Sequence, residues 1–125
     1  MSKPSLYIVE DDAHFRETFI DVMSLRGIEA SGAGSAEQAL TDLSQTRPSV
    51  IVLDVKLPDA HGFDLCKKIK RLDSLKNVPV IMISAWTRYN EASQRAEGAQ
   101  AGASLFLSKP VTMDKLWAEI ETLLQ

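Results

Sequence analysis

Four short, almost wholly apolar runs constrain the fold of this sequence more than any other feature. They consist of residues 6–9, 50–53, 80–83 and 105–107. Continuously apolar runs of this length are typical of strands that are buried on both faces of a parallel sheet. Residues 28–33 are a weaker candidate, because Ile28 and Ala30 are separated by polar residues, a composition that a sheet edge tolerates. The sequence therefore predicts five strands.

The segments between these runs carry apolar residues at helical spacing. The apolar faces comprise Phe15, Phe19, Val22 and Met23; Ala36, Ala39, Leu40 and Leu43; Leu65, Cys66, Ile69 and Leu72; and six residues between Met113 and Leu124. Residues 87–103 differ, because alanines make up most of their apolar set and a helix there should be less tightly anchored. Strands that alternate with helices predict an α/β fold, a doubly wound five-stranded parallel sheet with helices on both faces.

Length and composition favour one water-facing domain spanning residues 1–125. The formal net charge of −3 and the scattered basic residues argue against a mainly electrostatic nucleic-acid binder. Cys66 is the single cysteine, and the first residues lack the apolar run of a signal peptide. No apolar run approaches the roughly twenty residues that cross a bilayer. We therefore expect a cytoplasmic protein that neither enters a membrane nor binds nucleic acid through this domain.

Polar side chains stand where four of the predicted strands end. In open parallel sheets, ligands bind outside the carboxyl ends of the strands. Glu10, Asp11 and Asp54 would repel one another there unless a cation lay among them, and oxygen ligands favour a hard ion such as Mg²⁺. Acidic residues after a strand also cap the helix that follows, which we expect of Asp12 and which stays an alternative for Glu10 and Asp11.

Asp54 directly follows an apolar strand, where a carboxylate can act as a nucleophile toward phosphorus. Lys109 can neutralise the charge of a phosphoryl group, and the Ser84 hydroxyl can donate a hydrogen bond to one of its oxygens. Taken singly, a serine at a strand end, such as Ser84, and a lysine at the surface, such as Lys109, are common in proteins. Together with Asp54 they indicate a site for phosphoryl chemistry.

Four segments of the sequence form a recognisable set. They are Leu-Tyr-Ile-Val-Glu-Asp-Asp at 6–12, Val-Ile-Val-Leu-Asp-Val-Lys-Leu-Pro-Asp-Ala-His-Gly at 50–62, Met-Ile-Ser-Ala at 82–85, and Ala-Gly-Ala-Ser-Leu-Phe-Leu-Ser-Lys-Pro at 101–110. In this order they resemble the receiver domain of bacterial response regulators in two-component signalling, and the resemblance covers essentially the whole chain. It implies a flavodoxin-like, CheY-like three-layer fold with strand order 2-1-3-4-5.

The resemblance also implies a metal-assisted phosphoryl site. Asp54 would accept a phosphoryl group from the phosphohistidine of a sensor histidine kinase or a phosphotransfer protein. Asp11 would bind Mg²⁺ directly, Glu10 would act through a metal-bound water, and the backbone carbonyl of Lys56 would supply a further oxygen. Such a module would be no enzyme beyond Mg²⁺-dependent self-phosphorylation and autodephosphorylation.

The resemblance also implies what happens in the phosphorylated state. Ser84 and Lys109 would hold the phosphoryl oxygens, and the bond from Lys109 to Pro110 would be cis. Ser84 would move toward the phosphoryl group and make space for Phe106 to turn inward, although Phe106 also fits an ordinary core position. The output would be a shifted equilibrium on the face made by the fourth helix, fifth strand and fifth helix, which a downstream target or a second copy in a homodimer would read.

The sequence departs from the family pattern between Ser84 and Lys109, which lie 25 positions apart, about three more than usual. Trp86 and Lys56 occupy positions that tune the access of water to the acyl phosphate, and we expect bulky Trp86 to shield it. No output domain follows the last expected helix, which fits a single-domain regulator or part of a longer protein.

Two other functions were weighed against the receiver assignment. A Mg²⁺-dependent phosphatase with an aspartyl-phosphate intermediate would carry an acidic residue two positions after Asp54, where this chain has Lys56. A binding module that works without phosphorylation would not need the complete set of charged residues, which is costly to retain. Both are therefore less favoured.

Overall fold

Five parallel strands form one sheet in the computed structural model, which describes residues 3–85 and 91–125. The strands are β1 (Ser5–Val9), β2 (Glu29–Ala33), β3 (Val50–Asp54), β4 (Val80–Ser84) and β5 (Leu105–Ser108). Their order is β2-β1-β3-β4-β5, and every neighbouring pair is parallel. The predicted strands, including the weak edge strand, and the predicted strand order are confirmed.

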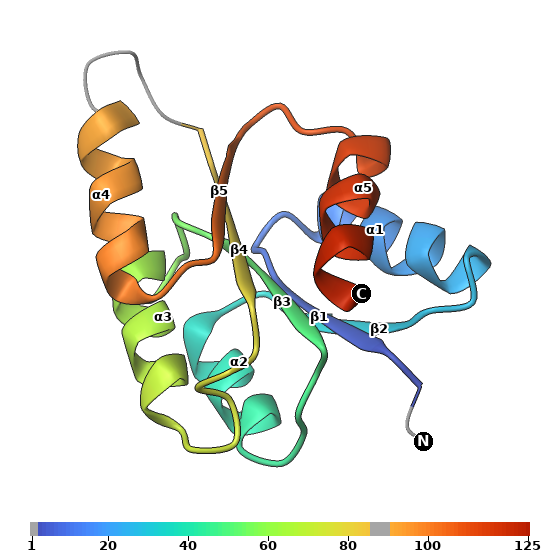
Figure 1. Ribbon diagram of the computed structural model, residues 1–125, viewed down its shortest axis with the longest axis horizontal. Coiled ribbons are helices and arrows are strands. Elements are labelled where there is room, and N and C mark those ends of the chain that lie inside the picture. The colour runs from blue at the N-terminus through green and yellow to red at the C-terminus, as the bar shows by residue number, and fades with distance from the viewer. Residues whose placement is uncertain (1–2, 86–90) are drawn as a thin grey trace.

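Five helices cover the two faces of this sheet. They are α1 (Ala13–Leu25), α2 (Ala36–Leu43), α3 (Gly62–Arg71), α4 (Glu91–Ala101) and α5 (Met113–Leu124). Helices α1 and α5 lie on one face, and α2, α3 and α4 lie on the other (Figure 1). None of the helices in the described ranges is both long enough and apolar enough to cross a membrane.

The core is divided into two layers by the alternation of side chains along the strands. One layer contains Ile8, Val52 and Ile81 of the strands, which pack with Phe19 of α1 and Leu116 of α5. The intervening strand residues face the other three helices in a second cluster. Because both faces are covered, the central strands are apolar throughout, which explains the continuous runs in the sequence.

Strands β3 and β4 each extend by one residue beyond the apolar run, so Asp54 and Ser84 are the last residues of regular strands. Ile83 is the register partner of Asp54, and Ser108 is that of Ser84. Both candidate side chains therefore start from hydrogen-bonded backbone rather than from loops.

Helix α4 packs more lightly than its neighbours, as its alanine-rich sequence predicts. Within its described side chains, only Gly98 and Ala101 are buried. Helix α3, by contrast, buries Phe63, Leu65, Cys66 and Ile69. Apolar burial scales with the free energy that anchors a helix, so α4 has the weaker hold on the sheet.

Asp59, in the loop between β3 and α3, ties that loop to the start of α2. Its two carboxylate oxygens accept hydrogen bonds from the backbone amides of Ala36 at 2.8 Å and Glu37 at 3.0 Å. These amides lower the pKa of Asp59 below its ordinary value. The loop that begins beside Asp54 is thereby fixed to a neighbouring helix.

We predict that Tyr7→Phe lowers the free energy of unfolding by about 1–2 kcal/mol. The buried Tyr7 hydroxyl donates to Asp42 Oδ2 at 2.5 Å, and Phe would leave this carboxylate without that donor. Urea denaturation at neutral pH measures the change. Thr122→Val, which removes an exposed hydroxyl bonded only within its own helix, serves as the control. A loss no larger than that of the control would contradict a role for this hydrogen bond.

Candidate functional site

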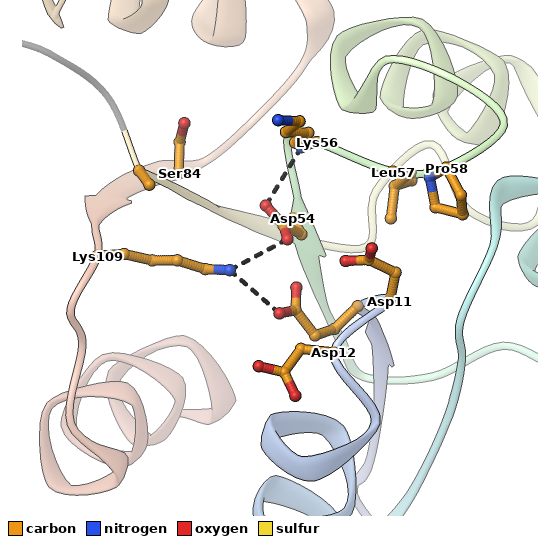
Figure 2. A pocket seen from close by; sticks show the side chains of 10 residues that line it. Asp11, Asp12, Asp54, Lys56, Leu57, Pro58, Ser84 and Lys109 are labelled. Carbon is orange, nitrogen blue, oxygen red and sulfur yellow. Dashed lines mark hydrogen bonds and ion pairs between the residues drawn. The ribbon is translucent and has the colours of Figure 1, made fainter.

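The carboxyl ends of β1, β3, β4 and β5 surround one polar cavity of about 370 Å³ (Figure 2). The residues that line it are Glu10, Asp11, Asp12, Asp54, Lys56, Leu57, Pro58, Ser84, Ala85 and Lys109. The structure thus brings together, at one edge of the sheet, every described site residue that the sequence singled out except Phe106. Trp86, the residue expected to shield the acyl phosphate, lies outside the described residues.

Lys109 bridges two buried carboxylates at the centre of the cavity. Its Nζ lies 3.1 Å from Asp54 Oδ2 and 3.1 Å from Glu10 Oε1. The other oxygen of Asp54 accepts a hydrogen bond from the backbone amide of Lys56 at 3.2 Å. Burial by itself would lower the pKa of Lys109, but the hydrogen bonds and charges of Glu10 and Asp54 outweigh it and raise this pKa above its ordinary value. Lys109 therefore stays charged throughout the physiological range.

The side chain of Glu10 is buried in an unusual environment. Burial raises its pKa to about 8, the negative charge of Asp54 adds to this rise, and Lys109 opposes it. Among the described residues, Glu10 Oε2 is a buried side-chain oxygen that has no hydrogen-bond partner. A buried carboxylate oxygen without a partner is costly, so this atom points to a ligand that would satisfy it.

The three carboxylates fit a divalent cation. Glu10, Asp11 and Asp54 each offer an oxygen, and these oxygens lie within 4.8 Å of one another. One ammonium, that of Lys109, balances only part of their charge, and an all-oxygen donor set suits a hard ion such as Mg²⁺. The backbone carbonyl of Lys56 stays a predicted ligand; Lys56 lines the same cavity.

Asp12 caps a helix, unlike Glu10 and Asp11. Its side chain accepts a hydrogen bond from the backbone amide of Phe15 at 3.2 Å and caps the start of α1. The capping role that the sequence predicted for Asp12 is confirmed. The capping alternative for Glu10 finds no support, because its side chain turns to Lys109.

Ser84 lies beside Asp54 but turns its hydroxyl away from it (Figure 2). Ser84 is buried, and its Oγ donates to Gln94 Oε1 in α4 at 3.3 Å. Nothing in the sequence pattern distinguished Gln94, because one glutamine in a polar helix resembles any other. Only the packing of α4 against the end of β4 makes it a partner of Ser84.

Phe106 is buried in the core against α4. A Cβ atom added at Gly98 would come within 2.7 Å of the Phe106 ring, so this glycine leaves the space that the ring occupies. The ring of Phe63 meets it edge-on at a centroid distance of 6.1 Å, and Arg95 donates to the Phe106 carbonyl at 3.2 Å. The core position that the sequence allowed for Phe106 is the one observed here, and its switching role stays a prediction.

The peptide bond between Lys109 and Pro110 is cis, as the resemblance implied. It directly follows the lysine that bridges Glu10 and Asp54.

Comparisons with known proteins agree with this arrangement. A family model described as "Response regulator receiver domain" matches residues 6–121. The transcriptional regulatory protein AfsQ1 of Streptomyces coelicolor is 35% identical over 98% of this chain, and the match covers 52% of the AfsQ1 sequence. The chain thus spans about half the length of the curated relatives it matches.

Solved structures show the same fold. A putative response regulator from Chloroflexus aurantiacus is 30% identical, covers 98% of both chains and superposes with a TM-score of 0.87. The chemotaxis response regulator CheY4 of Vibrio cholerae superposes with a TM-score of 0.90 at 24% identity, covering 98% of this chain and all of the other. At that identity the likeness concerns the fold alone.

The raised pKa of Glu10 predicts a pH dependence of stability when no divalent cation is present. A folded-state pKa of about 8, against 4.5 ordinarily, means that the folded protein holds a proton that the unfolded chain releases between these values. The contribution of Glu10 to the free energy of unfolding therefore falls as the pH rises from about 5 to 8.

Urea denaturation in EDTA at several pH values tests this expectation. The side chain in Glu10→Gln cannot ionise. The free energy of unfolding of this variant should therefore increase relative to that of the wild type as the pH rises. Glu17→Gln, at an exposed position of α1, is the matched control and should keep a constant difference. A constant difference for Glu10→Gln as well would show that Glu10 titrates normally.

Proposed function

The chain belongs to the response regulator receiver domain family, and from this premise we propose that it accepts a phosphoryl group on Asp54 from the phosphohistidine of a kinase or phosphotransfer protein. One observation carries the assignment: Asp54 ends a central strand, with Lys109 on one oxygen and the Lys56 amide on the other. Receiver domains are signalling modules rather than classical enzymes, so the phosphoryl group serves as a signal.

The proposed transfer is a displacement at phosphorus. A carboxylate oxygen of Asp54 forms the new bond to phosphorus while the bond to the imidazole nitrogen of the donor histidine breaks. Mg²⁺, when bound, supplies charge neutralisation for the phosphoryl oxygens. Glu10, Asp11, Asp54 and the Lys56 carbonyl would hold it, and the buried oxygen of Glu10 without a partner supports this assignment.

Lys109 would contribute positive charge where the phosphoryl oxygens gather. Its ammonium already lies 3.1 Å from Asp54 and is oriented by a second carboxylate, that of Glu10. Such a preorganised cation costs little reorganisation when the phosphoryl group arrives. Later attack by water would return free phosphate, and we propose that Lys56 and Trp86 tune the access of this water.

Ser84 would complete the phosphoryl site by moving. To reach a phosphoryl oxygen its hydroxyl has to leave Gln94, and this exchange would change how β4 is joined to α4. Because α4 buries little apolar surface, a modest change in its contacts can shift its equilibrium position. We propose that the face made by α4, β5 and α5, with Phe106 in its core, carries the signal to a downstream target or to a second copy.

The curated relatives indicate what a receiver of this kind controls. AfsQ1 is named as a transcriptional regulator, and we propose by analogy that the receiver controls an output function in the cytoplasm. The domain itself would bind no nucleic acid and no membrane.

We predict that the wild-type chain gains the mass of one phosphoryl group when it is mixed with acetyl phosphate and Mg²⁺. Asp54→Asn should abolish the gain, because an amide of nearly the same shape cannot form the acyl phosphate. Asp21→Asn, at an exposed position of α1, should leave it unchanged. Intact-mass spectrometry with and without EDTA provides the measurement. No mass gain in the folded wild type would favour a binding module that works without phosphorylation.

We predict that Gln94→Ala raises the affinity for beryllofluoride, a mimic of the phosphoryl group, by roughly two- to tenfold. Ser84 would then reach the mimic without first breaking its hydrogen bond to Gln94. Titration with beryllofluoride at fixed Mg²⁺ gives the affinity. Gln100→Ala, at an exposed position of α4, is the control. An unchanged or weaker affinity in Gln94→Ala would show that this hydrogen bond does not restrain Ser84.

A further inference from the structure

The turn between β1 and α1 holds three consecutive carboxylates that serve three different purposes. Glu10 turns into the sheet toward Lys109, and Asp12 turns back to cap α1. Asp11 is exposed and lines the cavity. Adjacent side chains can diverge in this way only if the backbone of the turn keeps one conformation, so the position of each carboxylate depends on what holds the turn.

The peptide groups of Glu10 are held from two sides. The Glu10 amide donates to the carbonyl of Ala33, which extends the pairing of β1 with the edge strand β2. The Glu10 carbonyl accepts a hydrogen bond from Nη1 of Arg16 at 2.5 Å. Arg16 lies in the first turns of α1, so its side chain spans back over the turn that leads into its own helix.

Two glycines provide the space for the Arg16 side chain. A Cβ atom at Gly34 would come within 3.1 Å of Arg16 Nη1, and one at Gly32 within 3.4 Å of its Cδ. The Gly32 position is also closed to side chains by the carbonyl of Ile8, at 2.5 Å. Gly32 in β2 and Gly34 just after it therefore leave the space in which the Arg16 side chain lies.

Arg16 does not use its charge on the metal ligands themselves. Within residues 3–85 and 91–125, no carboxylate forms an ion pair with it. A guanidinium bound to a backbone carbonyl leaves the oxygens of Glu10 and Asp11 available to a cation, while its planar group fixes the direction of that carbonyl. This is the arrangement expected of a residue that orients a site without occupying it.

We propose that Arg16 is a positioning residue for the metal-binding turn, holding the Glu10 carbonyl so that Glu10 and Asp11 present their oxygens to Mg²⁺. The inference rests on the proposed function, since it concerns the cation of the same site. Residues that orient metal ligands commonly contribute ten- to a hundredfold to metal affinity. We therefore expect the loss of Arg16 to weaken Mg²⁺ binding roughly tenfold.

The sign of the effect separates positioning from simple electrostatics. Removing a cation near an acidic site should by itself strengthen Mg²⁺ binding, because the negative potential of the site increases. Positioning predicts the opposite: Arg16→Met should bind Mg²⁺ more weakly. Arg26→Met removes one positive charge from the far end of the same helix and is the matched control, expected to leave the affinity within about twofold of the wild type.

Isothermal titration calorimetry with MgCl₂ on the purified chain, without any phosphoryl donor, measures the affinity. Arg16→Lys keeps the charge but loses the planar fork, and should recover only part of the affinity. Gly34→Ala keeps Arg16 but crowds its guanidinium, and should weaken binding by about twofold or more. This variant has no positive φ to strain it, so it provides a test even where Arg16→Met fails to fold, which circular dichroism would show.

The outcomes distinguish this inference from the proposed function. Weaker binding in Arg16→Met and Gly34→Ala, with Arg26→Met unchanged, supports the positioning role. Equal or tighter binding in Arg16→Met or Gly34→Ala, in a wild-type background that binds Mg²⁺ and gains a phosphoryl group on Asp54, overturns the positioning role alone. A folded wild type that neither binds Mg²⁺ nor is phosphorylated overturns both.

Discussion

The ammonium of Lys109, shared by the buried carboxylates of Glu10 and Asp54, is the interaction on which the site depends. It joins the end of β5 to the ends of β1 and β3, which are not adjacent to it in the sheet. Buried carboxylates without a cation are strongly unfavourable, so the ammonium of Lys109 stabilises the meeting of these strand ends. One ammonium for three carboxylates still leaves an excess of negative charge, which fits the divalent cation proposed for the cavity.

Two loops beside this cavity are anchored from outside it. Arg16 fixes the turn after β1, and Asp59 ties the loop after β3 to the first amides of α2. In each case a side chain bonds to backbone groups, so the loop is restrained while the site's own oxygens remain available. A site whose supporting contacts lie behind its ligands keeps its geometry before any ligand arrives.

The opposite side of the cavity is packed more lightly. Ser84 bonds to Gln94, and Phe106 packs into the space left by Gly98, four residues and about one helical turn further along the same face of α4. Both residues expected to respond to a phosphoryl group therefore contact the helix that buries least apolar surface. In the proposed function, the anchored acidic side binds the cation and the lightly packed α4 side carries the signal.

The sequence by itself determined the five strands, the edge position of β2, the helix cap at Asp12 and the residue types at the strand ends, because periodicity and short motifs encode which face a side chain takes and which element follows. It also placed Glu10, Asp11 and Asp54 at one edge, since parallel strands share that edge. The partners of these residues were decided by tertiary structure alone. Gln94 meets Ser84, Gly34 makes room for Arg16, and Glu10 keeps one oxygen without a partner only because distant elements pack at particular distances. Local sequence does not specify distances between remote elements, so these contacts could be identified only from the tertiary structure.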